Sequence, residues 1–108
     1  MIVVARVVRA VGDLRSARAS GAIERVAGAH DRGDFRILEH QVTGRRDHDD
    51  HGIELVVEAE DRVALARGMQ GFQVAAARAL NALAARRGTV FADRYRIVKP
   101  RRLTARRG

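Results

Sequence analysis

The feature that most constrains the fold is one long amphipathic stretch in the second half of the chain. After Asp61, apolar side chains recur every three or four residues, at Leu65, Met69, Phe72, Ala76, Leu80 and Leu83. This spacing places them on one side of an α-helix, while Arg67 and Arg78 lie off that side. Asp61 is expected to cap the helix, and Arg86, Arg87 and Gly88 to follow its end. The sequence therefore predicts a long helix that packs through a single side.

Strand-like segments lie on both sides of this helix. "IVVARVVRAV" is β-branched and apolar on both faces, as in an interior strand, and Asp13 after it is a candidate N-cap for a first helix over about residues 14–31, ended by Gly33. "DFRILEHQV" and "GIELVVEA" alternate and predict a hairpin, and "TVFADRYRIV" predicts a fourth strand. The order β-α-β-β-α-β predicts an α+β, ferredoxin-like split βαβ fold, in which one antiparallel sheet carries two helices on one face.

The alternation of "GIELVVEA" fixes which side chains of the third strand face the helices. Leu55 and Val57 are expected to pack on Met69, Phe72, Ala76 and Leu80 of the long helix. Glu54 and Glu58 are expected on the other, open face of the sheet.

Length and composition indicate a single domain. The chain has 108 residues and no cysteine, so neither disulfides nor thiolate zinc sites contribute. We predict one domain over residues 1–100 and a basic tail over residues 101–108. No segment has the length of a membrane span or the pattern of a secretory signal, so a cytoplasmic protein with no membrane partner is expected.

The charge is distributed unevenly along the chain. Residues 1–33 carry six basic and three acidic side chains, residues 34–61 three and nine, and residues 62–108 twelve and one. Of the 21 basic residues only Lys99 is a lysine, and guanidinium groups suit phosphate oxygens and stacking on bases. This bias favours a nucleic-acid partner, although a GC-rich coding sequence produces the same composition.

Two segments carry a resemblance to a known family. "GDFRILEHQVT" and "GIELVVEAEDRVALARGMQGFQVAAARALNALAARRGTVFADRYR" resemble the middle of single-tyrosine HUH transposases, in particular their REP-associated branch; "ALARGMQG" and "RRGTVFADRY" are the most specific pieces. The resemblance covers roughly residues 34–96. It implies the same ferredoxin-like fold and a protein that binds hairpin DNA and cuts single strands with a metal-assisted tyrosine.

The resemblance also identifies the positions of the expected metal ligands. In the family, two histidines flank one hydrophobic residue on the third strand, and the matching positions here are Gly52 and Glu54. Both imidazoles are missing, and His51 is one residue out of register, so on a regular strand it points to the opposite face. We therefore expect a degenerate site with no metal and no cofactor; Mg²⁺ or Mn²⁺ would be needed only if the site still functioned.

The remaining histidines leave one alternative open. The segment "RRDHDDHG" supplies His48, Asp50 and His51, which could converge with Glu54 on Mn²⁺ or Zn²⁺, but their spacing matches no established ligand pattern. A solvated loop beside a degenerate site is the favoured interpretation. For His30 and His40, packing or surface roles are expected.

No catalytic nucleophile is predicted. The resemblance places the attacking tyrosine on a helix after the fourth strand, whereas here that strand leads into "KPRRLTARRG", where the sequence given ends, as after a frameshift or an early stop. Tyr95 is the only tyrosine and lies in the "ADRY" segment before that point. Packing at the start of the fourth strand is its expected role.

These observations predict a transposase-like domain that binds single-stranded or hairpin DNA and has lost strand cleavage. The expected phosphate contacts are Arg86, Arg87, Arg94, Arg96, Lys99, Arg101 and Arg102. One alternative is a decayed remnant that acts only as a homodimeric interaction module through its exposed sheet edges. Another is an active metal-dependent single-strand nuclease or transposase that uses the shifted histidines. We also expect the protein to form a homodimer.

Overall fold

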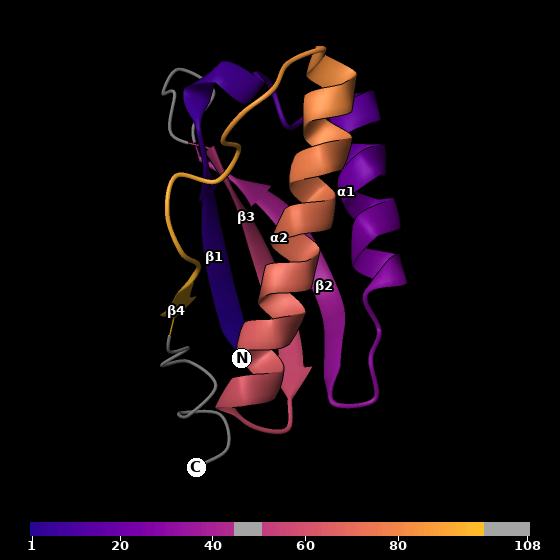
Figure 1. Cartoon of the computed structure of the whole chain (residues 1–108), viewed down its shortest axis with the longest axis vertical. Helices are drawn as coiled ribbons and strands as arrows, with labels where there is room; N and C mark the ends of the chain where they lie inside the picture. Colours follow the sequence, from indigo (N-terminus) through magenta and orange to yellow (C-terminus); the bar gives the residue numbers. More distant parts are fainter. Residues whose placement is uncertain (45–50, 99–108) are drawn as a thin grey trace.

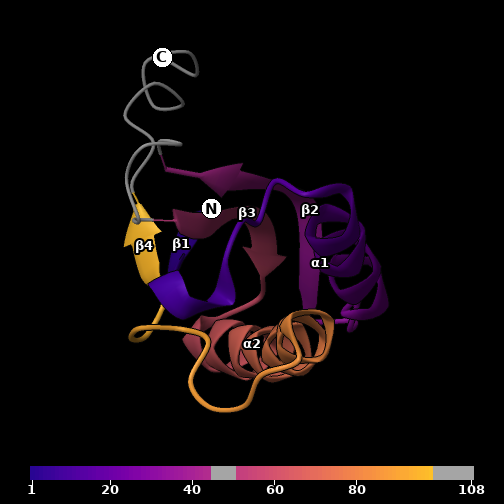
Figure 2. The ribbon, with the colours of Figure 1, turned by 90° about the horizontal axis from the view of Figure 1, so that it is seen from above.

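The fold is seen in a computed structural model of the chain, which describes residues 1–44 and 51–98. Its elements, in chain order, are β1 (Ile2–Val7), a short 3-10 turn η1 (Arg9–Val11), α1 (Ala17–Ala29), β2 (Phe35–Thr43), β3 (His51–Ala59), α2 (Arg62–Ala84) and β4 (Arg96–Val98). The strands form one antiparallel sheet in the order β2-β3-β1-β4 (Figure 1). Both helices pack on the same side of it (Figure 2). The predicted α+β, ferredoxin-like fold is confirmed.

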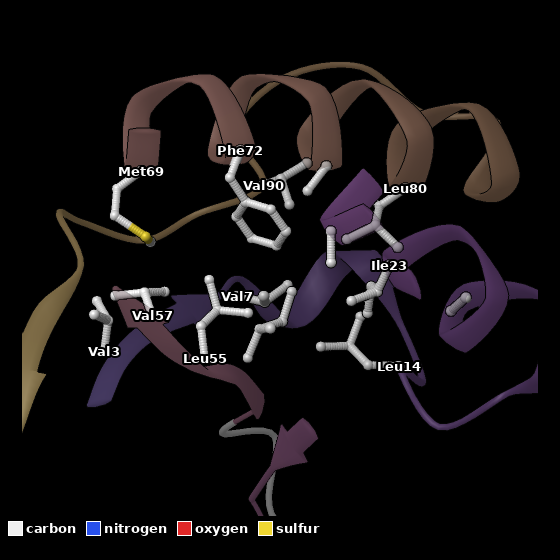
Figure 3. Close-up of a cluster of buried hydrophobic side chains, with 14 of the residues drawn as sticks. Val3, Val7, Leu14, Ile23, Leu55, Val57, Met69, Phe72, Leu80 and Val90 are labelled. Carbon is white, nitrogen blue, oxygen red and sulfur yellow. The ribbon is translucent and has the colours of Figure 1, made fainter. Parts of the chain in front are cut away.

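The core lies between the sheet and the two helices. Leu55 and Val57 of β3 are fully buried, as are Met69 and Phe72 of α2, and Figure 3 shows these side chains pointing toward one another. Glu58 is exposed and Glu54 only partly buried, on the other face. The predicted register of β3 is therefore confirmed, including the burial of Ala76 and Leu80 on the same side of α2.

Helix α2 approaches the start of β2 closely at Gly68. A Cβ atom added there would overlap the ring of Phe35, the first residue of β2. Because this glycine has no side chain, the Phe35 ring packs directly on the backbone of α2 and is fully buried. The glycine therefore fixes how closely α2 approaches the end of β2.

The N-terminal boundary agrees with the prediction for α2 but not for α1. Asp61 caps α2, because its Oδ1 accepts a hydrogen bond of 2.8 Å from the amide of Ala64. The N-cap of α1 is Ser16 and not Asp13: the Ser16 hydroxyl accepts from the amide of Ala19, while Asp13 accepts from the amide of Arg15 in the preceding turn. The predicted start at residue 14 was thus early by about one turn.

Both helices also end before the glycines that were expected to stop them. α1 ends at Ala29 with His30 as its C-cap, before Gly33. α2 ends at Ala84, and the next residue, Ala85, has a left-handed backbone conformation with φ of 50°. Gly88 is left-handed too but lies in the following loop.

Two irregularities were not predicted. β2 contains a bulge at Leu38, because Ile37 pairs with Val57 and Glu39 already pairs with Val56. The fourth strand is much shorter than the predicted "TVFADRYRIV": only Arg96–Val98 pair with β1, while Phe91 forms an isolated bridge with Val7. Between these two contacts the chain leaves the sheet.

Parts of the prediction lie outside the described residues. The loop that carries His48 and Asp50, and the tail that carries Lys99, Arg101 and Arg102, are among them. Within residues 1–44 and 51–98, no helix is both long enough and apolar enough to cross a membrane.

Candidate nucleic-acid interface

The open face of the sheet contains the two positions that the resemblance assigns to metal-ligating histidines. Gly52 and Glu54 pair with Arg6 and Val4 of β1, so they share the face turned away from the helices. Glu54 accepts a hydrogen bond of 2.7 Å from the side-chain amide of Gln41 on β2. This carboxylate is thus held by a neighbour on the sheet.

The position of Gly52 has little room for a side chain. A Cβ atom there would lie 2.9 Å from Oγ1 of Thr43 and 3.1 Å from the carbonyl oxygen of Ala5. The first neighbour can rotate, whereas the second belongs to the backbone of the adjacent strand. A side chain at this position would therefore require Thr43 to move and the Ala5 carbonyl to give by a few tenths of an ångström.

His51 lies on the opposite face from Gly52, as its register predicts. It pairs with Val7, which is buried in the core, so its side chain lies on the helix side of the sheet. Its Nδ1 is buried without a hydrogen-bond partner. In the part of the chain that the structure describes, no three His, Asp or Glu side chains are arranged to hold a metal ion.

The other two described histidines have packing positions. His30 makes a 2.8 Å hydrogen bond between its Nδ1 and the carbonyl of Val26, and its ring meets the ring of Phe72 edge-on. His40 pairs with Leu55 and is partly buried on the helix side of the sheet. Neither contributes to the open face.

The centre of the open face is apolar. Val98, Ile2 and Val56 form one row across β4, β1 and β3, and the bulge sets both Leu38 and Glu39 of β2 opposite Val56. Leu38 is 48% exposed and Val98 36% exposed. We call this row, made of Leu38, Val56, Ile2 and Val98, the apolar band. Val4 extends it by one position on β1.

Charges on the open face are divided between its halves. β2 and β3 carry Glu39, Glu54 and Glu58, and β1 and β4 carry Arg6 and Arg96. Arg36 also lies on the β2 side, where it approaches Glu58 at 3.8 Å and Asp31 at 3.9 Å. Arg6 approaches Asp93 at 3.8 Å. The open face therefore combines an apolar band with charges several of which, at Arg6, Arg36 and Glu58, already have partners.

The outer side of α2 is different, because no carboxylate occurs in the chain between Asp61 and Asp93. Two hollows flank this side. One, of about 490 Å³, lies toward α1 and is lined by Arg32, Arg67, Gln70, Gly71, Val74, Ala75 and Arg78; we call it the arginine hollow. The other, of about 450 Å³, lies toward the segment before β4 and is lined by Ala66, Gln70, Gln73, Val74, Arg94 and Tyr95; we call it the tyrosine hollow.

The two hollows form one continuous surface, since Gln70 and Val74 line both. Figure 1 shows α2 lying between α1 on one side and the segment that leads to β4 on the other. Neither hollow is lined by an acidic residue. A hollow at the start of β2, by contrast, is lined by Asp34, Glu58 and Glu60. A polyanion would thus meet no carboxylate in the lining of the two hollows on α2.

The predicted phosphate contacts do not all lie on one surface. Arg86 and Arg87 follow the end of α2, where Arg86 donates a 2.7 Å hydrogen bond to Oδ1 of Asn81. Arg94 lines the tyrosine hollow, whereas Arg96 pairs with Val4 and so lies on the open face of the sheet. Sequence reasoning did not select Arg67, Arg78, Gln70 or Gln73. Their spacing along α2, on the side away from the core, was the available signal.

Tyr95 is partly buried against the core, as its predicted packing role requires. It also lines the tyrosine hollow, which the sequence did not indicate.

Comparisons with known proteins found no match for this chain. No protein-family model, no curated protein and no solved structure matches the chain. The class of protein is therefore defined by topology alone, as a ferredoxin-like α+β domain with one open sheet face.

Proposed function

We propose that this protein binds single-stranded or hairpin DNA through the outer side of α2 and the segment that follows it, and that it does not cut the DNA. One observation carries the proposal: the arginines on this side of the molecule face solvent in a stretch of 31 residues, Arg62 to Ala92, that contains no carboxylate. Nucleic-acid backbones are recognised by such unneutralised guanidinium groups.

The pairing of the arginines supports the same surface. Within residues 1–44 and 51–98, Arg67 and Arg78 form no ion pair, whereas Arg36 has two acidic neighbours and Arg32 approaches Asp34 at 3.8 Å. A guanidinium without a carboxylate partner does not have to break an ion pair within the protein when it binds a phosphate. Binding through α2 is consequently favoured over binding through the open face of the sheet.

The resemblance to HUH transposases supports DNA as the nucleic acid and a cytoplasmic setting. Cleavage is not part of the proposal, because the two positions that the resemblance assigns to histidines are Gly52 and Glu54, and the surroundings of Gly52 are crowded. Attack of a tyrosine on the scissile phosphate needs a metal that polarises the phosphate and a hydroxyl held in line with it. The proposal includes neither.

Binding is tested with a fluorescent hairpin and a single-stranded oligonucleotide over a series of salt concentrations. We expect Arg67→Gln combined with Arg78→Gln to weaken binding about tenfold and to reduce the salt slope by about 0.7 for each lost phosphate contact on a single strand. Arg6→Gln combined with Arg36→Gln is the matched control, since it removes the same charge from the open face. Equal losses in the two double variants would contradict the assignment to α2.

Cleavage is tested with the same oligonucleotides, labelled and incubated with Mg²⁺ or Mn²⁺. We expect neither cut strands nor a covalent adduct. Cutting that disappears in Tyr95→Phe would make Tyr95 a nucleophile. Cutting that persists in that variant would point to a water-activating site near His51, and either result would replace this proposal with an active nuclease.

A second candidate function is supported by the apolar band: self-association through the open face. A two-fold axis parallel to the strands would stack β2 and β3 of one copy on β1 and β4 of the other, so that the half with Glu39, Glu54 and Glu58 faces the half with Arg6 and Arg96. A two-fold axis perpendicular to the strands would instead stack β3 of one copy on β3 of the other. The glutamates of the two copies would then face one another. Because Glu58 and Arg6 already approach Arg36 and Asp93, the charges that favour the first arrangement are Glu39 and Glu54 on one half and Arg96 on the other.

Self-association is tested by native mass measurement over a range of protein concentrations, with and without the hairpin. A dimer whose population falls in Val56→Lys would support the face-to-face arrangement. A dimer that tolerates this change would point to the sheet edges, and a monomer at every concentration would exclude both.

A further inference from the structure

The tyrosine hollow contains side chains that phosphate binding does not require. Two side-chain amides, Gln70 and Gln73, line it together with the aromatic ring of Tyr95 and the guanidinium of Arg94. Its volume of about 450 Å³ lies within the range of about 300–1,000 Å³ found for small-ligand sites. Unlike the arginine hollow, it combines an aromatic ring with two side-chain amides.

These polar groups are not engaged elsewhere. In the part of the chain that the structure describes, the amides of Gln70 and Gln73, the hydroxyl of Tyr95 and the guanidinium of Arg94 form no hydrogen bond or ion pair with the protein. Gln70 and Gln73 are three residues apart on α2, so they present their amides on one side of the helix. The hollow therefore offers free donors and acceptors beside an aromatic ring.

We propose that the tyrosine hollow binds one unpaired nucleobase of the bound strand, with the Tyr95 ring as the stacking surface and Gln70 and Gln73 as partners for the edge of the base. An amide supplies both a donor and an acceptor, which matches the mixed donor and acceptor edges of bases. Stacking on an aromatic side chain is the usual way in which single strands are held. The inference rests on the proposed DNA binding and adds base recognition to it.

The continuity of the surface favours a nucleotide over another flat polar ligand such as a sugar. The arginine hollow begins where the tyrosine hollow ends, at Gln70 and Val74, and it offers Arg67 and Arg78 to the neighbouring phosphates. Arg94, beside Tyr95, offers a further phosphate contact on the other side. An isolated sugar site would have no need of a flanking row of cations.

The test separates base contacts from backbone contacts. A fluorescent single strand of mixed sequence is compared with an abasic strand of equal length, which keeps the phosphates and loses every base. We expect the protein to bind the base-bearing strand about tenfold more tightly, as one stacked base provides. Free glucose and maltose, added as competitors, are expected to leave this binding unchanged.

Three variants assign the preference to the hollow. Tyr95→Leu and Gln73→Leu should abolish the preference for the base-bearing strand while leaving the salt slope unchanged, whereas Tyr95→Phe should retain it because the ring remains. Phe91→Leu is the matched control, since it removes a partly buried ring from the same segment without altering the lining of the hollow. Melting temperatures confirm that each variant is folded.

The outcomes distinguish this inference from the proposed function. Equal affinity for the two strands, or a preference that survives Tyr95→Leu, would overturn the base site and leave DNA binding intact. Competition by sugar would overturn the base site too. Absence of binding to either strand would overturn both.

Discussion

The outer side of α2 and the open face of the sheet are both exposed surfaces of one small domain. They differ in how their charged side chains are paired. On α2, Arg67 and Arg78 form no ion pair in the part of the chain that the structure describes, and both line the arginine hollow. On the sheet, charges of both signs surround an apolar band and approach one another. The net charge of +8 alone does not distinguish these surfaces. Only the pairing of each arginine indicates where a polyanion would bind.

The geometry of the elements explains the contrast. Side chains opposite one another on adjacent strands have Cβ atoms about 5 Å apart, so like charges on a sheet are costly and unlike charges are favoured. On a helix the outer residues have their nearest neighbours three and four positions away along the helix, and no such position on α2 carries a carboxylate. A helix such as α2 can therefore carry arginines alone, provided that its apolar side is well packed, as it is here.

The largest effects are expected from placing one carboxylate on each surface. Val56→Asp interrupts the apolar band, and because a two-fold interface contains the change twice, we expect self-association to weaken about a hundredfold. Val74→Asp places an acid between the two hollows on α2, and DNA affinity should fall about tenfold. Native mass and fluorescence anisotropy measure the two effects. If either variant reduced both properties equally, the two surfaces could not be separate.

A smaller effect, on stability, is expected from adding a side chain at Gly52. Gly52→Ala forces a Cβ atom toward Thr43 and the Ala5 carbonyl, which should lower the free energy of unfolding by about 1–3 kcal/mol. Gly28→Ala, in α1 with open space around it, should instead stabilise by about 0.5–1 kcal/mol. Urea denaturation measures both.

Two further variants sharpen the result at Gly52. Combining Gly52→Ala with Thr43→Ala should cost less than the sum of the single changes, because the nearer neighbour is removed. Introducing histidines at both positions, as Gly52→His with Glu54→His, should not produce a cutting enzyme. Additive costs, or the appearance of cleavage, would mean that the open face is less crowded at Gly52 than its geometry indicates.

Asp61 is expected to act on helix stability and not on the charge of the α2 surface. Asp61→Ala removes the N-cap of α2 and should cost about 1 kcal/mol, while Asp61→Asn keeps an accepting oxygen and should cost much less. Thermal denaturation compares them. A cost shared equally by both variants would show that the negative charge, and not the cap, is what matters.

The smallest effect is expected from Arg36→Gln. Its ion pairs with Glu58 and Asp31 are exposed on both sides, so their loss should change stability by less than about 0.5 kcal/mol. DNA affinity should also remain unchanged. A large loss of either would indicate that the open face contributes more than its paired charges suggest.

Regular elements were predictable from the sequence because their signals are local. The apolar stripe of α2, the cap at Asp61 and the alternation of β3 all depend on residues within a few positions of one another. The bulge at Leu38 was missed because it is defined by which residue of β3 lies opposite. The short β4 was missed because Val90 and Phe91 carry strand-like side chains but pair with the far end of β1.

The candidate site was less predictable for the same reason. That Gly52 and Glu54 share the open face follows from alternation, but the crowding around Gly52 depends on Thr43 from one neighbouring strand and Ala5 from the other. The hollows on α2 likewise depend on how α1 and the segment at Arg94 pack beside it. Such features arise only when distant segments meet.

The position of the first strand in the sheet affects how the chain folds as it is made. β1 lies between β3, which starts at His51, and β4, which starts at Arg96. At about 5–20 residues per second of synthesis, β1 waits several seconds for its first partner strand. Until then a β-branched segment, interrupted only by Ala5 and Arg6, is open to pairing with other nascent chains. The emergence of His51–Ala59 from the ribosome is thus the first point at which β1 can pair within its own domain.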